Sequence, residues 1–427
     1  MNFGCFPAHR FPAQCLIAIF GMSLLSPIAF AAKPVAESAA VPAASLGAVP
    51  QIYTSDGADL AAFRQRVTAG DSAAVRLSKA VIADADKALA SGPFSVVSNA
   101  TIPPSGDKHD YMSLSPYWWP DPSKPDGKPY IRRDGEFNPE RANYDLGSLE
   151  QLSEAVDDLS LAYYFSGDEK YAAHCAKLIR AWFIDPETRM NPNLKYAQSV
   201  PGYSEPRPSG IIEGGRFRKV IDAVGLIEGS ASWSQGDTEA MKAWFSQMVE
   251  YVLTSEQGKT ELLQPNNHAT WATVQVATYA LFTGQNDKAK EWLEKQFKRL
   301  LDSQVKPDGT QPEELARTLS FHYSRFNLLA LVEVADLGKR VGLDLWNYKT
   351  EDGRCIRTAL DYLVPYATKE KPWPHKTIAP IKHGDMVVIL RRAANAYNEP
   401  KYEAAAELIR KEDKRAQVDM LFPSKLQ

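Results

Sequence analysis

The sequence lacks the features that mark several common classes of function. No basic run is present and the formal net charge is −3, so we do not expect a nucleic-acid-binding protein. Glycine-rich phosphate loops and a Gly-x-Ser-x-Gly nucleophile motif are absent. The seven histidines are scattered without the spacing of metal ligands, so we predict no metal site.

Cysteine is also scarce, with four residues in the chain. Cys5 and Cys15 fall in an N-terminal segment that we expect to be removed. Cys175 and Cys355 remain and lie far apart in the sequence. Export would permit a disulfide, but the spacing does not establish one, and we expect both residues to be buried as small apolar side chains.

The longest apolar run lies at the N-terminus. Arg10 precedes a mostly apolar stretch over 15–30, and Ala29-Phe30-Ala31 fits the small-x-small rule for cleavage. We predict a signal peptide over 1–31, with a retained anchor as the alternative, and therefore a periplasmic or secreted protein without a membrane contact after cleavage. Residues 32–50, rich in Ala, Pro, Ser and Val, are expected to form a flexible leader, and 51–427 a single domain.

Helical periodicity dominates that domain, and 44% hydrophobic residues can fill a large core. Helical hairpins broken by Gly or Pro turns are predicted over 149–165 and 171–183, over 271–282 and 288–301, over 387–397 and 402–411, and more loosely around 235–237. Repeated helical hairpins predict an all-α fold, an α/α toroid or incomplete α/α barrel, although an open solenoid would share the pattern.

Two irregular regions, 109–143 and 191–215, interrupt the helices with Pro, Gly and, in the first, aromatic residues. Long loops inside a compact domain are usually functional or disordered. The aromatic content favours function.

The segment 264–271 has the character of a helix start. Pro265 and the paired asparagines precede an apolar helical period. Asn267 and His268 would then lie beside free backbone N–H groups, which form a natural anion site. An ordinary Asn cap with a packed His would give the same pattern.

The segment 313–323 contains Arg317 and Tyr323. Six positions do not place the two on one helical stripe, so a bend or turn is needed to bring them together. A lone Tyr is usually a core or surface residue. His322 is adjacent, and we expect neighbouring side chains not to face the same cleft.

These two segments resemble the alginate lyase family, which has motifs matching Asn266-Asn267-His268 with Trp271, and Arg317 with Tyr323. The segments 111–122 and 127–132 resemble the same superfamily, and the likeness extends over roughly 110–392. The resemblance implies a lyase of a uronic-acid polymer on an α/α toroid, close to the branch with glucuronan-cleaving members.

Such a lyase removes the C5 proton and expels the O4 oxygen. The carboxylate beside C5 activates that proton poorly, so donors must hold it. The resemblance assigns this task to Asn267, His268 and Arg317, and Arg can grip a carboxylate with two donors. Tyr323 is the candidate base and acid, with Arg317 favouring its phenolate; His268 is the alternative base. No cofactor is required.

Sugar binding needs aromatic faces and local positive charge. The candidates are Tyr117, Trp118, Trp119, Arg207, Arg216, Lys382 and His383. Core packing and solvated surface are the competing interpretations. Because the chain is acidic overall, we expect a locally basic cleft for an anionic polysaccharide.

Poly-β-D-mannuronate in alginate is the first choice of substrate and glucuronan the second. Two other classes stay open. A glycoside hydrolase would need two carboxylates across a cleft, such as Asp121 with Glu313 or Glu314. A non-catalytic glycan-binding protein would need the aromatic loops but not the Asn–His and Arg–Tyr pairs.

Overall fold

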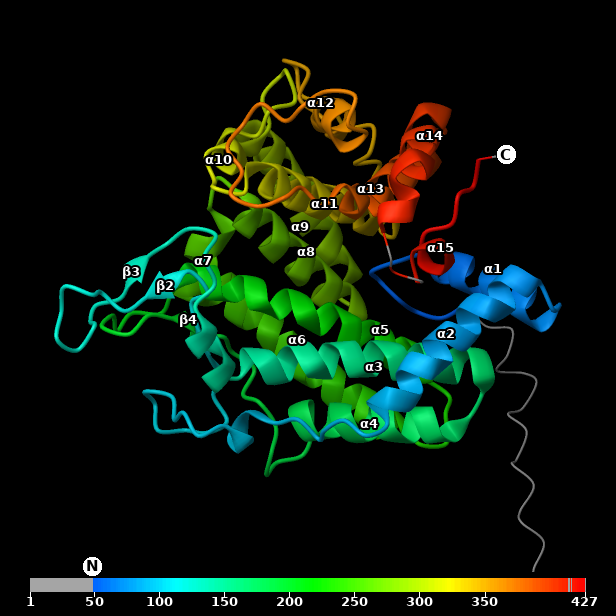
Figure 1. Cartoon of the computed structure of the whole chain (residues 1–427). Helices are drawn as coiled ribbons and strands as arrows, with labels where there is room; N and C mark the ends of the chain where they lie inside the picture. The colour runs from blue at the N-terminus through cyan, green and yellow to red at the C-terminus, as the bar shows by residue number, and fades with distance from the viewer. Residues whose placement is uncertain (1–48, 414, 416, 427) are drawn as a thin grey trace, which may run out of the picture. The chain divides into compact units, whose positions relative to one another are not determined.

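Helices account for most of the residues that the computed structural model describes, which are 49–413, 415 and 417–426 (Figure 1). The predicted signal peptide and all but the last two residues of the predicted leader lie outside this range. The described residues fall within one compact unit.

The helices of this unit are α1 (Gly57–Thr68), α2 (Ser72–Ala88), α3 (Leu146–Ser166), α4 (Glu169–Phe183), α5 (Phe217–Ile227), α6 (Gln235–Thr254), α7 (Glu256–Leu262), α8 (Asn267–Phe282), α9 (Asn286–Gln304), α10 (Pro312–Leu315), α11 (Ser320–Lys339), α12 (Ile356–Ala367), α13 (Val387–Tyr397), α14 (Pro400–Ile409) and α15 (Val418–Leu421). Short 3₁₀ segments include η4 (Pro208–Arg216) and η5 (His383–Met386). Consecutive helices pack as pairs, α3 on α4, α8 on α9 and α13 on α14. Contacts of α3 with α5, α6 with α8 and α8 with α11 connect the pairs. This is the predicted α/α-toroid fold.

Three of the predicted hairpins are confirmed at their turns. Gly167 ends α3 with φ 69°, a left-handed conformation that glycine adopts without steric cost. Gly284 follows α8 with φ 77°, and Asn398 ends α13 with φ 51°. Asp168 then caps α4 by accepting a hydrogen bond from the Lys170 N–H.

The fourth predicted turn is wrong in position. Gln235, Gly236 and Asp237 form the first turn of α6 and not a break between helices. Ser234 caps this helix, and its hydroxyl and the Asp237 carboxylate each accept a hydrogen bond from the other's backbone N–H. This capping box stabilises the start of a helix, whereas Gly236 alone had suggested a stop.

Helix α8 joins two parts of the hydrophobic core. Ala272, Val276 and Tyr279 belong to a cluster with α3–α6, while Ala269 and Val274 belong to a cluster with α9 and α11–α14. Of the residues in α8, His268 alone is not fully buried. The helix therefore holds its first turn rigidly, with one side chain left accessible there.

The two irregular regions contain short strands, β1 (Met112–Leu114), β2 (Trp118–Trp119), β3 (Ile131–Arg132) and β4 (Tyr196–Ser199). β1 pairs with β4 in parallel, and β2 pairs with β3 in antiparallel. Contacts of β4 with η4, and of η4 with α7 and α8, bring these regions to the start of α8.

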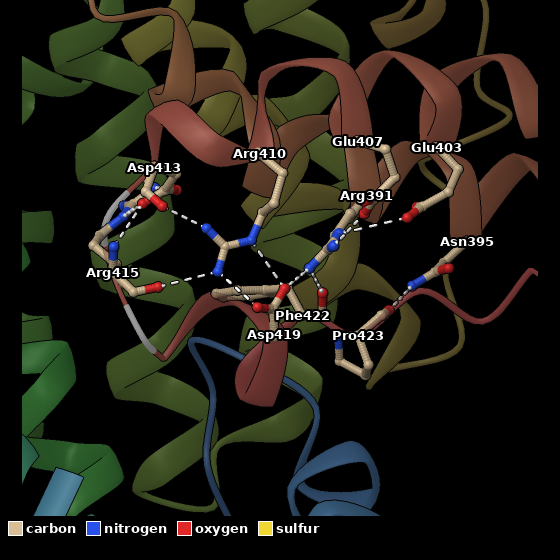
Figure 2. Close-up of polar contacts among 10 residues, drawn as sticks. All are labelled: Arg391, Asn395, Glu403, Glu407, Arg410, Asp413, Arg415, Asp419, Phe422 and Pro423. Carbon is tan, nitrogen blue, oxygen red and sulfur yellow. Dashed lines mark hydrogen bonds and ion pairs between the residues drawn. The ribbon is translucent and has the colours of Figure 1, made fainter. Parts of the chain in front are cut away.

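The C-terminal segment is held by a cluster of ion pairs, the C-terminal cluster, shown in Figure 2. Arg391 on α13 meets Glu407 at 2.6 Å and Asp419 at 2.5 Å. Arg410 also donates to Asp419, at 2.7 Å, and Arg415 pairs with Asp413 at 2.5 Å. Charges on three segments of the chain thus fasten α15 against α13 and α14.

Cys175 and Cys355 are both free thiols. Cys175 is fully buried, as predicted, but Cys355 is only half-buried, because it precedes the first turn of α12. None of the described helices is both long and apolar enough to cross a membrane.

Candidate active site

One cleft of about 700 Å³ contains most of the residues singled out in the sequence. It is bounded by the β2–β3 region, η4, the end of α7, the start of α8, and the turn from α10 into α11. The predicted residues that line it are Tyr117, Trp118, Arg207, Arg216, Asn267, His268, Arg317 and Tyr323.

The cleft is locally basic in a chain of net charge −3. Its charged walls are Arg132, Arg141, Arg207, Arg216 and Arg317 against Glu213, Glu261 and Glu313. Five guanidinium groups face three carboxylates, so an anionic polymer is attracted here.

Tyr323 lies in the first turn of α11 and is 6% exposed. Its hydroxyl is 2.7 Å from the Tyr117 hydroxyl, which comes from the segment just before β2. Burial raises the pKa of Tyr323 well above its usual 10, Tyr117 adds to this, and the charge of Arg317 opposes it. Arg317 therefore acts in the expected direction, toward the phenolate, but burial and Tyr117 outweigh it.

Arg317 lies in the turn between α10 and α11, and this turn brings it to Tyr323. Its guanidinium carbon is 3.6 Å from the centroid of the Tyr323 ring, so the cation stacks on the ring instead of meeting the hydroxyl. Its Nη2 and Nε donate to Asp134, at 2.7 and 3.1 Å. Although burial alone would raise the pKa of Asp134, Arg317 and the Thr318 N–H bring it below its usual range. Arg317 was expected to bind a substrate carboxylate through two donors. In the structure it forms this bidentate pair with Asp134 instead.

His268 is oriented by a buried carboxylate. Its Nδ1 lies 2.6 Å from Oε1 of Glu261, which is 1% exposed and belongs to α7. This contact places the proton on Nδ1 and leaves Nε2 as the nitrogen available to a ligand. Burial alone would lower the pKa of His268, but Glu261, with a smaller contribution from Glu314, outweighs burial and the pKa is raised.

Asn267 is held in the same way by Glu314. Its Nδ2 donates to both carboxylate oxygens, at 3.0 and 2.9 Å, and its backbone N–H donates to Oε1 at 2.6 Å. Asn266 caps α8 by accepting a hydrogen bond from the His268 N–H. The predicted helix start is confirmed, and Asn267 is anchored at that start.

Arg216 and Arg207 differ in their partners. Arg216 donates to Glu150 at 2.6 Å and faces the buried Glu213. Arg207 stacks on Trp118, with its guanidinium carbon 4.8 Å from the indole centroid. Within the described residues its side chain forms no ion pair, and its buried Nε has no hydrogen-bond partner.

The sequence model of the alginate lyase family matches residues 95–373 of the chain. The chain belongs to the alginate lyase family. It is therefore a polysaccharide lyase.

Solved structures agree with this assignment. An alginate lyase from Bacteroides ovatus is 39% identical, with a TM-score of 0.84 over 88% of this chain and 99% of that one. Alginate lyase A1-III, from Sphingomonas species A1, shares the fold at 18% identity in an apo form, with a TM-score of 0.53 over 82% of this chain and 90% of that one. A further form of A1-III, complexed with a tetrasaccharide, has a TM-score of 0.50 at 18% identity, over 81% of this chain and 88% of that one. No protein of curated function matches the chain by sequence.

Family membership removes the two competing classes. The carboxylates considered for a hydrolase also do not form a pair across the cleft. Asp121 accepts hydrogen bonds from Ser123 in a turn and does not line the cleft, and Glu314 lies behind Asn267.

Three predicted substrate-binding residues do not line the cleft. Trp119 follows Trp118 in β2, and successive strand residues point to opposite faces; its indole instead meets Arg133, at 5.1 Å, and donates to the Glu136 carbonyl. Lys382 is exposed in the segment before η5. His383 begins η5 and lies against Phe321, at 6.0 Å between ring centroids.

We expected that His322 and Tyr323, as neighbours in the sequence, would not face the same cleft. This expectation is wrong, because both residues line the cleft. The α11 residues that line the cleft, His322, Tyr323 and Phe326, share one side of the helix, so the two neighbours reach the same space.

The carboxylates that hold the central residues were not predicted from the sequence. They are Asp134, Glu261 and Glu314. Glu261 and Glu314 lie near the two motifs, so acidic residues flanking them were the available signal. Asp134 is 183 positions from Arg317 and gave no local signal.

Proposed function

We propose that the protein cleaves poly-β-D-mannuronate in alginate by β-elimination, with Tyr323 as the residue that moves the proton. The observation that carries this proposal is the Tyr323 hydroxyl in a basic cleft, with the Arg317 guanidinium stacked on its ring. The choice of alginate rests on the relative from Bacteroides ovatus, described as an alginate lyase.

The first requirement of the reaction is to neutralise the substrate carboxylate. Removing the C5 proton puts negative charge beside a group that is already anionic, so donors must stabilise the developing charge. His268 suits this task because Glu261 favours its imidazolium and leaves Nε2 free to donate. Asn267 lies next to it on α8, and Arg317 adds positive charge at the ring of Tyr323.

The second requirement is a base. Tyr323 acts as its phenolate, takes the C5 proton, and then returns a proton to O4 as the C4–O4 bond breaks. One residue performs both transfers only when the proton and the leaving oxygen lie on the same face of the sugar. β-D-mannuronate has this arrangement at C4 and C5, and so does β-D-glucuronate. Tyr117 bonds to the same hydroxyl at 2.7 Å and positions it in the free protein.

His268 is less suited to be the base. A base must be neutral before it accepts a proton, and Glu261 stabilises the protonated imidazole instead. We therefore assign His268 to carboxylate binding and Tyr323 to proton transfer.

The predicted signal peptide supports action in the periplasm or outside the cell, where the polymer occurs. Glucuronan remains the second candidate substrate, because glucuronate differs from mannuronate only at C2.

The test is ultraviolet absorbance while the mature protein acts separately on polymannuronate, polyguluronate and glucuronan. Rising absorbance from the new C4=C5 bond, fastest on polymannuronate, is expected. A faster rise on glucuronan would replace the substrate and keep the mechanism. New reducing ends without absorbance would contradict elimination.

A further inference from the structure

Arg207 is a cation of the cleft without a counter-charge. Within the described residues it forms no ion pair, and its Nε is buried without a hydrogen-bond partner. The charged side chain that acts on it is Arg132, which has the same sign. Burial, and then Arg132, lower the pKa of Arg207. Because a half-buried charge without a counter-charge is costly, an anion bound here would relieve the cost.

The backbone beneath this cation is fixed. Gln257 of α7 is 6% exposed and donates to the Arg207 carbonyl at 2.7 Å and to the Leu194 carbonyl at 3.0 Å. Gly210, three residues on, lies so close to Ala197 that a Cβ would stand 2.4 Å from its carbonyl oxygen. The guanidinium therefore projects from a rigid base, which a preformed ligand site requires.

An aromatic ring lies against the guanidinium, and a second aromatic ring packs on the first. The guanidinium lies over Trp118 of β2, whose strand partner in β3 is Arg132. The Tyr203 ring meets Trp118 at 5.8 Å and 75°, and Tyr203 is 55% exposed. Stacking on Trp118 holds the planar guanidinium and leaves its edge N–H groups for a ligand, while Tyr203 offers an apolar surface to a sugar ring.

We propose that Arg207, Trp118 and Tyr203 form a second carboxylate subsite, which binds a uronate other than the one that reacts at Tyr323. This rests on the proposed function in one respect, namely that the ligand is a uronic-acid polymer. Every sugar of such a polymer carries a carboxylate, and Arg207 lines the same cleft as Tyr323. A chain long enough to extend past the reaction centre therefore presents a carboxylate to Arg207, whose N–H groups can accept it in a bidentate pair.

The test is calorimetric binding of β-1,4-linked hexamannuronate to protein carrying Tyr323→Phe, so that no turnover occurs. Adding Arg207→Met is expected to weaken binding about ten- to a hundredfold, the range for a hydrogen bond to a charged group. Arg207→Lys keeps the charge and loses less affinity. In protein with Tyr323 intact, the Arg207→Met loss appears in KM and not in kcat, because a remote carboxylate is held equally before and during the reaction.

The matched control is Arg133→Met. Arg133 also stacks on a tryptophan of β2, Trp119, but lies outside the cleft, so its loss should leave binding unchanged. Circular dichroism melting of each variant separates lost affinity from lost folding, and Arg207→Lys provides a second folded variant.

Three results would overturn the subsite. They are unchanged affinity in Arg207→Met, equal losses in Arg207→Met and Arg133→Met, and a loss confined to kcat. The same titrations with hexaglucuronate keep the test valid if glucuronan is the substrate. A parent protein that binds neither hexamer overturns the proposed function together with the subsite, whereas normal parent binding with unchanged Arg207→Met overturns the subsite alone.

Discussion

The arginines of the cleft and those of the C-terminal cluster differ in the number of carboxylates that surround them. Arg391 is 7% exposed at its side chain and has Glu403, Glu407 and Asp419 within 3.6 Å. Arg207 lines an open cleft and has no acidic partner in the described chain. Removing a guanidinium from water costs free energy at both positions. Of the two, Arg391 has this cost offset by carboxylates of the described chain.

This difference in ionic partners distinguishes arginines that stabilise the fold from arginines that can bind a ligand. A guanidinium surrounded by carboxylates has its charge balanced by the chain and holds segments of the chain together. A guanidinium without a partner contributes nothing comparable to folding and is available to a ligand. The central residues of the cleft lie between these extremes, because Arg317, His268 and Asn267 are each held by one carboxylate.

The largest expected effect is a loss of activity caused by a substitution in the cleft. Tyr323→Phe should lower kcat by about 10²- to 10⁴-fold, since a positioned acid–base group contributes that much. Its melting temperature should change little, because the substitution removes only the hydrogen bond to Tyr117. Absorbance assays and calorimetric polymer binding check both parts.

The control is Tyr402→Phe, which removes a hydroxyl that donates to Asp361 outside the cleft. Activity should survive in this variant. A Tyr323→Phe protein with most of its turnover would rule out Tyr323 as the base.

The next effect lies in the C-terminal cluster. Arg391→Met should lower the free energy of unfolding by about 3 kcal/mol, because Glu403 and Glu407 would keep their charge without an ionic partner. The kcat of the protein that stays folded should not change. Chemical denaturation and the absorbance assay measure the two quantities; reduced kcat with unchanged stability would break the comparison.

A smaller effect comes from the carboxylate behind His268. The proposed reaction needs the imidazolium of His268 and the phenolate of Tyr323 together. kcat/KM therefore rises with pH up to the pKa of His268 and is level above it, where gain of phenolate offsets loss of imidazolium. Glu261→Gln removes the group that raises this pKa and leaves burial, which lowers it. The rise in kcat/KM should end at a lower pH, and the level part should fall about tenfold per unit of pKa change.

Glu256→Gln is the control, because Glu256 is an exposed glutamate of the same helix, α7. If the whole rising limb moved to lower pH while the level part kept its height, His268 would act as a neutral base. A rise that ends at the same pH as in the parent protein would mean that Glu261 does not set the pKa of His268.

The smallest effect is expected at the edge of the C-terminal cluster. The Arg415 side chain is 54% exposed and pairs with Asp413 alone among carboxylates of the described chain. Arg415→Met should cost less unfolding free energy than Arg391→Met, because it breaks one ion pair instead of three and the backbone N–H of residue 415 still donates to the buried Asp413. A loss equal to that of Arg391→Met would show that the number of ion pairs does not distinguish the two arginines.

Local sequence signals predicted the elements that carry the site. Turn residues such as Gly167 and Asn398 ended helices where expected, and Asn266 began α8. These are interactions between near neighbours, which a single sequence displays. The side chains of Asn267 and Tyr323 reached the same cleft because each lies in the first turn of a helix that borders it.

Contacts between distant residues could not be predicted in this way. Asp134 meets Arg317 across 183 positions, and Asn267 meets Glu314 across 47. Trp119 failed as a cleft residue because a two-residue strand was invisible in a Pro-rich region, and the strand decides which side each tryptophan faces. Tertiary packing determines these contacts. The patterns between near neighbours that a single sequence displays do not show which distant residues meet.

Helix α8 belongs to both halves of the hydrophobic core, and its only accessible side chain is His268. The chain consequently cannot be divided between these two parts of the core without disturbing the active site. A fragment that ends before α9, or begins after α7, would expose one apolar face of α8 to solvent. His268 would then no longer be held by a fully packed helix. The smallest functional unit is therefore the whole ring of helices, which is why neither half can be trimmed to a minimal enzyme.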